Sequence, residues 1–254
     1  PSMPTPESPT PESPTPEAGL GAPSWADVLW IDAGSVNCYL CHDPDGFTLI
    51  DAATPGKADV IFDRLAEFGG RPSDLKRIFI THADLDHAGS AAAVQQRSGA
   101  TVYASAATAA LLVEGRSPKH MPRLVQFIVD RFVRYGAVDR AAIRPVADGD
   151  EVPILGRSRV LAAPGHTPDQ YTLHCPAAGI VFAADALNTR DNRLQLSPPR
   201  MTADPSATKR TAARLLGLAP RVVACGHGAP LVDDAAAVDA LLAQLGGSEV
   251  GSSL

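Results

Sequence analysis

The segment from Thr81 to His87 concentrates side chains that bind metal ions. It reads Thr-His-Ala-Asp-Leu-Asp-His, so two imidazoles flank two carboxylates directly after an apolar run. Three further candidates, His166, Asp185 and His227, each follow a later apolar run. Loops at strand ends often carry functional groups because the strands hold them rigidly. We therefore interpret these residues as ligands of a metal centre.

The number and type of these ligands indicate the metals. The full candidate set is His82, Asp84, Asp86, His87, His166, Asp185 and His227. Seven nitrogen and oxygen ligands exceed what one tetrahedral ion uses, which favours two adjacent ions that share one ligand. Imidazole and carboxylate suit zinc, iron or manganese, and the absence of cysteine argues against a purely structural zinc. We expect two divalent metal ions, zinc before iron or manganese.

Such a centre has a defined chemistry. A bound cation lowers the pKa of water from 15.7 to about 7, so hydroxide exists there at neutral pH. This metal-bound hydroxide is expected to attack a substrate carbonyl, while one ion stabilises the developing oxyanion. Asp86 or Asp185 would orient the nucleophile or accept its proton. No Ser, Cys or Lys nucleophile is required.

At these residues the chain resembles the metallo-β-lactamase (MBL) superfamily, whose signature is a His-x-His-x-Asp-His loop followed by a His, an Asp and a His at later strand ends. The resemblance covers about residues 26–245. It implies an α/β (α+β) fold, a four-layer αββα sandwich with a dinuclear site in the cleft between the sheet edges. It also implies a ligand assignment: His82, Asp84 and His166 for the first ion, Asp86, His87 and His227 for the second, and Asp185 as the bridge.

One position departs from the family pattern. The loop here is His-x-Asp-x-Asp-His, with Asp84 where the family has its second His. A carboxylate is harder than an imidazole and adds negative charge, which shifts the first site toward iron or manganese. Some relatives, including the flavodiiron proteins, carry an acidic ligand there and remain dinuclear, so we expect Asp84 to bind metal. In the alternative interpretation, Asp84 does not bind metal but supports the residues that do, and the first site then binds its ion weakly.

The resemblance implies a hydrolase of a small ester, lactone or thioester, similar to lactonases and glyoxalase II. An iron-dependent oxidoreductase of the same fold, such as a persulfide dioxygenase or a flavodiiron-like protein, is the alternative that Asp84 keeps open. β-Lactamase activity is less favoured because the chain does not resemble the subclass with a Cys ligand at position 185. The net charge of −6 offers no basic face for a nuclease. The nearly complete ligand set argues against a binding protein with a dead site.

The length of 254 residues suits one large α/β domain. Residues 1–24 contain the repeat PTPES, PTPES, PTPEA and are predicted to form a disordered Pro/Glu-rich tail. Residues 25–246 are predicted to form a single MBL-like domain, and residues 247–254 a flexible C-terminus. The pair Gly246-Gly247 is expected to end the last helix.

Apolar runs and turn residues predict the elements that position the ligands. Strands are expected at 28–31, 36–41, 47–50, 76–80, 101–104, 143–146, 159–162, 171–175, 180–183 and 221–224. Helices are expected at 58–68, 88–97, 106–114, 121–135, 205–216 and 235–245. The mixture of strands and helices through both halves indicates two sheets covered by helices.

We expect the substrate cavity above the metals, between the segments 116–140 and 187–203. Six residues could line this cavity, although each could instead lie in the core or in a solvent-exposed loop: Phe127, Phe132, Tyr135, Asn188, Arg190 and Arg193. Three histidines without a matching motif are interpreted as surface or structural: His42, His120 and His174. Of these, His120 precedes the predicted helix at 121–135 and could touch substrate.

The remaining features indicate the cellular setting. Four scattered cysteines do not resemble a disulfide framework and fit a reducing compartment. No apolar run approaches the length of about 18 to 20 residues that spans a bilayer, and the chain as given shows no secretory signal. We expect a cytoplasmic protein with a small-molecule substrate that binds neither nucleic acid nor membrane. The sequence leaves the oligomeric state open.

Overall fold

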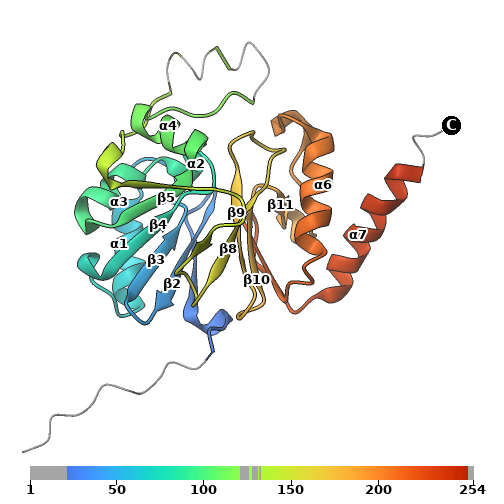
Figure 1. Ribbon diagram of the computed structural model, residues 1–254, viewed down its shortest axis with the longest axis horizontal. Coiled ribbons are helices and arrows are strands. Elements are labelled where there is room, and N and C mark those ends of the chain that lie inside the picture. The colour runs from blue at the N-terminus through green and yellow to red at the C-terminus, as the bar shows by residue number, and fades with distance from the viewer. Residues whose placement is uncertain (1–21, 121–125, 128–130, 132, 251–254) are drawn as a thin grey trace, which may run out of the picture.

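Two six-stranded sheets packed face to face form the centre of the molecule (Figure 1). The computed structural model describes residues 22–120, 126, 127, 131 and 133–250, so most of the predicted tail lies outside the described residues. The first sheet has the strand order β1-β2-β3-β4-β5-β6. Its strands are β1 (Val28–Asp32), β2 (Asn37–Asp43), β3 (Gly46–Ile50), β4 (Leu75–Phe79), β5 (Thr101–Ser105) and β6 (Ile143–Val146).

The second sheet has the strand order β14-β13-β10-β9-β8-β7. Its strands are β7 (Glu151–Val152), β8 (Ser158–Ala162), β9 (Tyr171–Cys175), β10 (Ile180–Ala184), β13 (Val222–Cys225) and β14 (Leu231–Val232). A short antiparallel ribbon of β11 (Leu187–Asn188) and β12 (Gln195–Leu196) follows β10. In both sheets parallel and antiparallel pairs are mixed, and the parallel pairs β3–β4 and β10–β13 lie next to the metal-ligand loops.

Helices cover the outer face of each sheet, which completes the predicted αββα sandwich (Figure 1). The first sheet carries α1 (Ala58–Glu67), α2 (Leu85–Ala88), α3 (Ala91–Ser98) and α4 (Ala106–Glu114), and the second carries α6 (Pro205–Leu216) and α7 (Ala235–Val250). Single 3-10 turns are η1 (Trp25–Asp27), η2 (Pro72–Asp74), η3 (Arg140–Ala142), η4 (Arg190–Asn192) and η5 (Pro199–Met201).

Strand β2 contributes side chains to two hydrophobic cores, one on each face of the first sheet. Successive side chains of a strand point to opposite faces of its sheet. Cys38 and Leu40 pack into the core beneath the helices, whereas Tyr39 and Cys41 pack into the core between the sheets. Both faces of β2 are therefore buried, which explains why its sequence is a nearly continuous apolar run. All four cysteines of the chain are buried free thiols.

Two predictions, on the last helix and on the ligand segment, are wrong. Helix α7 continues through Gly246 and Gly247 to Val250, so this pair does not end the helix as expected. Glycine in a helix interior costs only about 1 kcal/mol relative to alanine, and no proline follows to block propagation. The four-residue helix α2, which carries Asp86 and His87, was expected to be loop because it is too short to show a helical period.

Most of the predicted helix at 121–135 lies outside the described residues, as does Phe132. Within the described part of the chain, no helix is long and apolar enough to cross a bilayer.

Candidate metal centre

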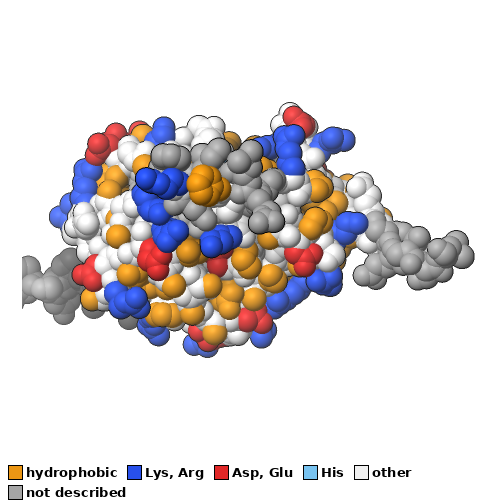
Figure 2. Space-filling model, turned by 90° about the horizontal axis from the view of Figure 1, so that it is seen from above, with side chains coloured by type: hydrophobic (Ala, Val, Ile, Leu, Met, Phe, Trp, Pro, Cys, Tyr) orange, Lys and Arg blue, Asp and Glu red, His pale blue; other side chains and the backbone are white. Residues whose placement is uncertain are grey.

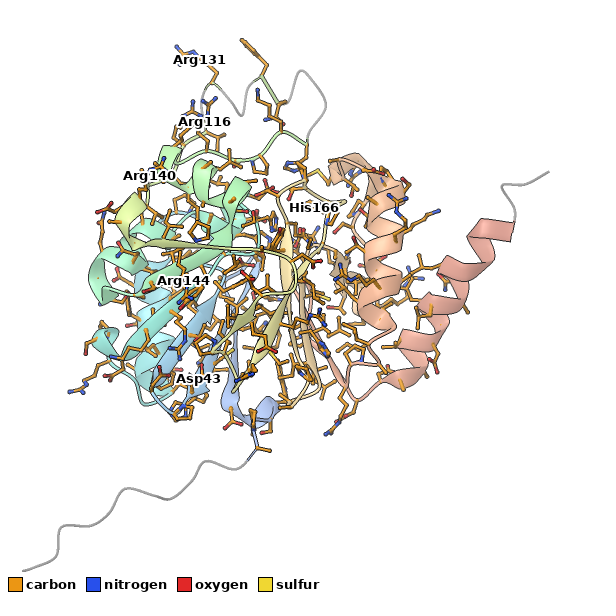
Figure 3. All side chains as sticks on the ribbon, viewed as in Figure 1. Asp43, Arg116, Arg131, Arg140, Arg144 and His166 are labelled. Carbon is orange, nitrogen blue, oxygen red and sulfur yellow. The ribbon has the colours of Figure 1, made fainter. Side chains whose placement is uncertain are left out.

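The seven predicted ligands gather at one edge of the sandwich, where the two sheets meet. His82 and Asp84 follow β4, and the next two ligands lie in α2. His166 follows β8, Asp185 follows β10 directly and His227 follows β13. In Figure 3, His166 lies between the strands of the two sheets, near the end of the molecule that carries α4 and the start of α6. Strand ends from both sheets therefore supply one cluster.

Within this cluster the ligand atoms form overlapping groups whose members lie within 4.8 Å of one another. The groups are His82, His87 and Asp185; His82, Asp84 and His166; and Asp86, His87 and His227. The second and third groups match the two sets predicted for the first and second ion. Asp185 lies between them, because its carboxylate oxygens are 3.3 Å from Nε2 of His87, 3.5 Å from Nε2 of His166 and 3.2 Å from Nε2 of His227.

Unpaired polar atoms in the cluster test whether these residues fit metal ions. Nε2 of His82, Nε2 of His87, Oδ1 of Asp84 and Oδ1 of Asp185 are buried without a hydrogen bond. Buried polar atoms nearly always have a partner, so four unpaired atoms within one cluster fit an occupant that the protein atoms do not supply. A set of imidazole and carboxylate donors suits zinc, iron or manganese. The residues therefore fit divalent cations, and the number of ions and the roles of individual ligands stay predictions.

Asp51, which the sequence analysis missed, fixes two members of the cluster. Its Oδ2 lies 2.8 Å from Nδ1 of His87, and Oδ1 accepts a hydrogen bond from the backbone N–H of Thr81 at 2.9 Å. A carboxylate on the far nitrogen of a ligating His sets the tautomer and orientation of the ring. Asp51 directly follows β3, so the strand-end signal that revealed the ligands also marked this residue.

Backbone and side-chain contacts hold the other ligand loops. Oδ2 of Asp169 accepts hydrogen bonds from the backbone N–H of Ala83 and from the hydroxyl of Thr108, which ties the ligand loop to α4. Nδ1 of His227 donates to the carbonyl oxygen of Ser35 at 2.6 Å. Both contacts hold the ring or the loop in its orientation toward the cluster.

Burial and mutual charge set the protonation of the cluster. Burial alone would raise the pKa of Asp84, but the hydrogen bond with His166 and the neighbouring imidazole of His82 hold it well below its usual range. The pKa of Asp185 is likewise held down, against its burial, by the charge of His87 and a hydrogen bond with His227. Burial opposes protonation of His87, yet the carboxylates of Asp185 and Asp51 raise its pKa. Both carboxylates are therefore ionised at neutral pH, as metal ligands must be.

Gly226 shows how tightly the centre is packed. A Cβ at this position would collide with Oδ1 of Asp185 and with Cε1 of His87. Only glycine lets the backbone after β13 approach two candidate ligands this closely. The packing of the centre therefore requires glycine at position 226.

A cavity of about 430 Å³ opens above the cluster. Asp84, Asp86, His166, Asp185 and His227 lie at its base, and Ser117, Val133, Asn188, Ser197, Arg200 and Met201 are among its walls. These walls come from the two predicted segments, 116–140 and 187–203.

Some of the residues predicted to line the cavity do so, and others do not. Asn188 and Arg190 line the cavity, whereas Arg193 does not. Tyr135 is buried away from it, with its hydroxyl 3.0 Å from the carbonyl oxygen of Ala83, and Phe127 is 66% exposed.

His120 is not a surface residue, which was one of the roles expected for it. Its side chain is 1% exposed, and its Nε2 lies 3.3 Å from Oδ2 of Asp84 at the metal cluster. No motif surrounds it, so the sequence alone held no signal for this placement. By contrast, His42 is exposed and stacks on Phe47, and His174 pairs across the second sheet with Val181, both away from the centre.

The chain is similar to known proteins in sequence and in fold. The sequence profile described as the metallo-beta-lactamase superfamily matches residues 31–227, most of the chain. The chain belongs to this superfamily. Among curated relatives, a probable metallo-hydrolase of Bacillus subtilis, YflN, is 26% identical over 76% of this chain and 79% of its own length. A hydroxyacylglutathione hydrolase of Maricaulis maris is 28% identical over 59% of this MBL-fold chain and 46% of its own length.

Solved structures agree on the fold. The metallo-beta-lactamase SMB-1, solved with mercaptoacetic acid, has a TM-score of 0.63 and 25% identity, and the match covers 81% of this chain and 78% of that one. A metallo-beta-lactamase family protein of Thermus thermophilus has a TM-score of 0.63 and 22% identity, with 87% and 80% covered. These likenesses leave the substrate open.

Proposed function

We propose that this protein is a dinuclear metal-dependent hydrolase of a small ester, lactone or thioester. The observation that carries the proposal is the position of the seven-residue cluster at the base of a cavity of about 430 Å³. A cavity of this size matches small-molecule sites, whose volumes are roughly 300–1,000 Å³. The names of two relatives, a probable metallo-hydrolase and a hydroxyacylglutathione hydrolase, support hydrolysis.

Two divalent ions would supply an activated water and a Lewis acid for the substrate carbonyl. The two catalytic carboxylates then have different roles. Asp185 is buried, its pKa is held low by His87, and it faces three imidazoles, which suits a bridging ligand. Asp86 is about one-third exposed toward the cavity, with its Oδ2 3.6 Å from Nε2 of His227, so it is the carboxylate that can accept a proton from the attacking water.

The cavity walls indicate the substrate's charge. Arg190 and Arg200 line the cavity on the side of the β11–β12 ribbon. Lys and Arg side chains also lie on both sides of the face seen in Figure 2. Guanidinium groups bind carboxylates through paired hydrogen bonds. We therefore favour a substrate that carries a carboxylate beside its scissile carbonyl.

The test is a panel of lactones, acyl-glutathione thioesters and aryl esters, assayed on the metal-loaded protein. We expect turnover of at least one class, and Asp86→Asn should reduce kcat by about 10²- to 10⁴-fold, the usual contribution of acid–base catalysis. Asp191→Asn is the control, because Asp191 is exposed and does not line the cavity. Equal rates for Asp86→Asn and wild type would contradict the assigned role.

Asp84 supports one other function of the same fold, an iron-dependent oxidoreductase. Its carboxylate lies within 3.5 Å of three imidazole nitrogens and favours a harder ion at the first site than a three-imidazole site does. Oxygen consumption by the iron-loaded protein with a thiol or persulfide substrate, and no hydrolysis across the panel, would favour this function over the hydrolase.

A further inference from the structure

His120 lies beside the metal cluster, on a segment that carries none of the predicted ligands and outside the three ligand groups described above. Its Nε2 lies 3.3 Å from Oδ2 of Asp84, and its ring centroid lies 5.2 Å from that of His166. The backbone N–H of His120 donates to Oε1 of Gln126 at 3.0 Å, which holds the residue in place from the opposite side. The imidazole is thus buried, directed inward and anchored.

Neither ring nitrogen of His120 makes a hydrogen bond of acceptable geometry. A buried imidazole without a partner is costly, because its polar atoms have lost water and gained nothing in return. Proximity to Asp84 does not remove this cost. An ordinary structural histidine in a core is hydrogen-bonded, so the orphaned ring points to an occupant that the protein atoms do not provide.

The surroundings of Asp84 point to a cation as that occupant. Its Oδ2 lies 3.2 Å from Nε2 of His166, 3.3 Å from Nε2 of His120 and 3.5 Å from Nε2 of His82. A carboxylate oxygen has about two lone-pair directions, so it cannot accept three well-directed hydrogen bonds. Ligand atoms around a tetrahedral ion with bonds of about 2.0–2.1 Å are about 3.3–3.4 Å apart, which agrees with all three separations.

We propose that His120 is a ligand of the first metal ion, alongside His82, Asp84 and His166. The proposal rests on the metal centre but not on the hydrolytic activity. It accounts for the departure of the loop from the family pattern: the imidazole that is missing at position 84 is supplied from position 120. The first ion then has three imidazoles and one carboxylate from the protein.

This ligand set changes the coordination of the first ion. Four protein ligands complete a tetrahedral shell, and a catalytic zinc keeps one position open for water or substrate. The second ion has the same number of predicted protein ligands, Asp86, His87, His227 and the bridging Asp185, so an attacking water would be its fifth ligand. If Asp185 also bridges to the first ion, the coordination number of the first ion exceeds four, which suits iron or manganese better than zinc.

Metal titration of His120→Ala tests the proposal. Apo-protein, prepared with a chelator, is titrated with Zn²⁺ against a chromophoric competitor, and with Co²⁺ while the visible spectrum is recorded. We expect one of the two equivalents to bind at least 10-fold more weakly in the variant, since even residues behind the ligands alter affinity by 10- to 100-fold. The cobalt spectrum of that equivalent should also change.

His174→Ala is the matched control, because His174 lies on β9 outside the cluster, and it should leave both equivalents unchanged. Wild-type affinity and an unchanged cobalt spectrum in His120→Ala would overturn the proposal. So would failure of the wild-type protein to bind any metal, whereas absent hydrolysis with two bound ions would leave it intact.

A crystal structure of the zinc-loaded wild type removes any dependence on the folding of the variant. Anomalous diffraction should place an ion about 2.0–2.1 Å from Nε2 of His120. A separation above 3 Å would contradict ligation.

Discussion

Asp51 illustrates how a residue outside the predicted ligand set positions one that belongs to it. Its carboxylate lies 2.8 Å from Nδ1 of His87 and also binds the backbone and hydroxyl of Thr81, at the start of the ligand loop. Both the ring and the loop therefore depend on one buried side chain. Sequence reasoning identified the seven cluster residues because they share motifs and strand ends, but it could not show which neighbours orient them.

We predict that Asp51→Asn lowers metal affinity by about 10- to 100-fold, because the amide keeps the shape but weakens the contact that makes His87 a strong donor. Competitive metal titration measures this. Asp59→Asn, on the exposed surface of α1, should have wild-type affinity. An Asp51→Asn protein that binds both equivalents as tightly as wild type would contradict the positioning role.

A substitution of Arg190 tests whether the substrate is an anion. We expect Arg190→Ala to raise KM about 10-fold or more for an anionic substrate, since hydrogen bonds to charged groups contribute roughly 1.5–3 kcal/mol. A neutral analogue should show little change. Arg193→Ala is the matched control three residues away, outside the cavity. Equal KM changes for charged and neutral substrates would remove the carboxylate from the proposal.

At the scale of elements, long periodic segments were predictable and short ones were not. Helix α4 and strands β6 and β9 have the predicted bounds, and α4 is delimited by the side-chain cap of Ser105 and by Gly115 in the left-handed conformation. Strands β7, β11, β12 and β14 have two residues each, and α2 has four, so none can show a period. The position of His120 beside Asp84 results from a tertiary contact, so no local sequence pattern could predict it.

Helix α6 links a capping residue to the metal centre. The Asp204 carboxylate accepts hydrogen bonds from the backbone N–H groups of Ser206 and Ala207, and the N–H of Asp204 donates to the carbonyl oxygen of Gly165, next to His166. The bond from Ala207, with the hydroxyl of Ser206, lowers the pKa of Asp204. The start of the helix therefore also supports a ligand loop.

We predict that Asp204→Ala lowers Tm by a few degrees at neutral pH and that this difference shrinks in acid. Because the pKa of Asp204 is lower in the folded state, its stabilisation is complete above the unfolded value, near pH 4, and is lost as the pH falls through the folded value. Thermal unfolding from pH 7 to pH 2 measures it. A Tm difference that stays constant over this range would contradict an ionised cap.

For the whole molecule, the centre exists only where the two sheets meet, so contacts between the sheets are part of the site. Tyr39 on β2 donates its hydroxyl to the carbonyl oxygen of Cys225 on β13, at 2.6 Å, two residues before His227. Asn37 also donates to this oxygen. The sheet that carries His82 is thereby joined to the loop that carries His227.

We predict that Tyr39→Phe lowers the free energy of unfolding by about 1 kcal/mol, because one buried hydrogen bond is lost while the ring remains. Denaturant unfolding of the metal-free protein measures this. Tyr171→Phe is the control, since the Tyr171 hydroxyl has no hydrogen bond among the described residues, and it should have wild-type stability. Equal losses in both variants would show that the bond between the sheets does not stabilise the fold.

The proposed activity requires two metal ions held by strand-end residues of both sheets. Mass-spectrometric metal analysis of the metal-loaded, desalted protein, compared with Asp185→Ala, measures this most directly. We predict two equivalents per chain in the wild type and a clear loss in the variant, because Asp185 lies between both ligand groups. One equivalent or none in the wild type, or two in both proteins, would contradict the dinuclear centre.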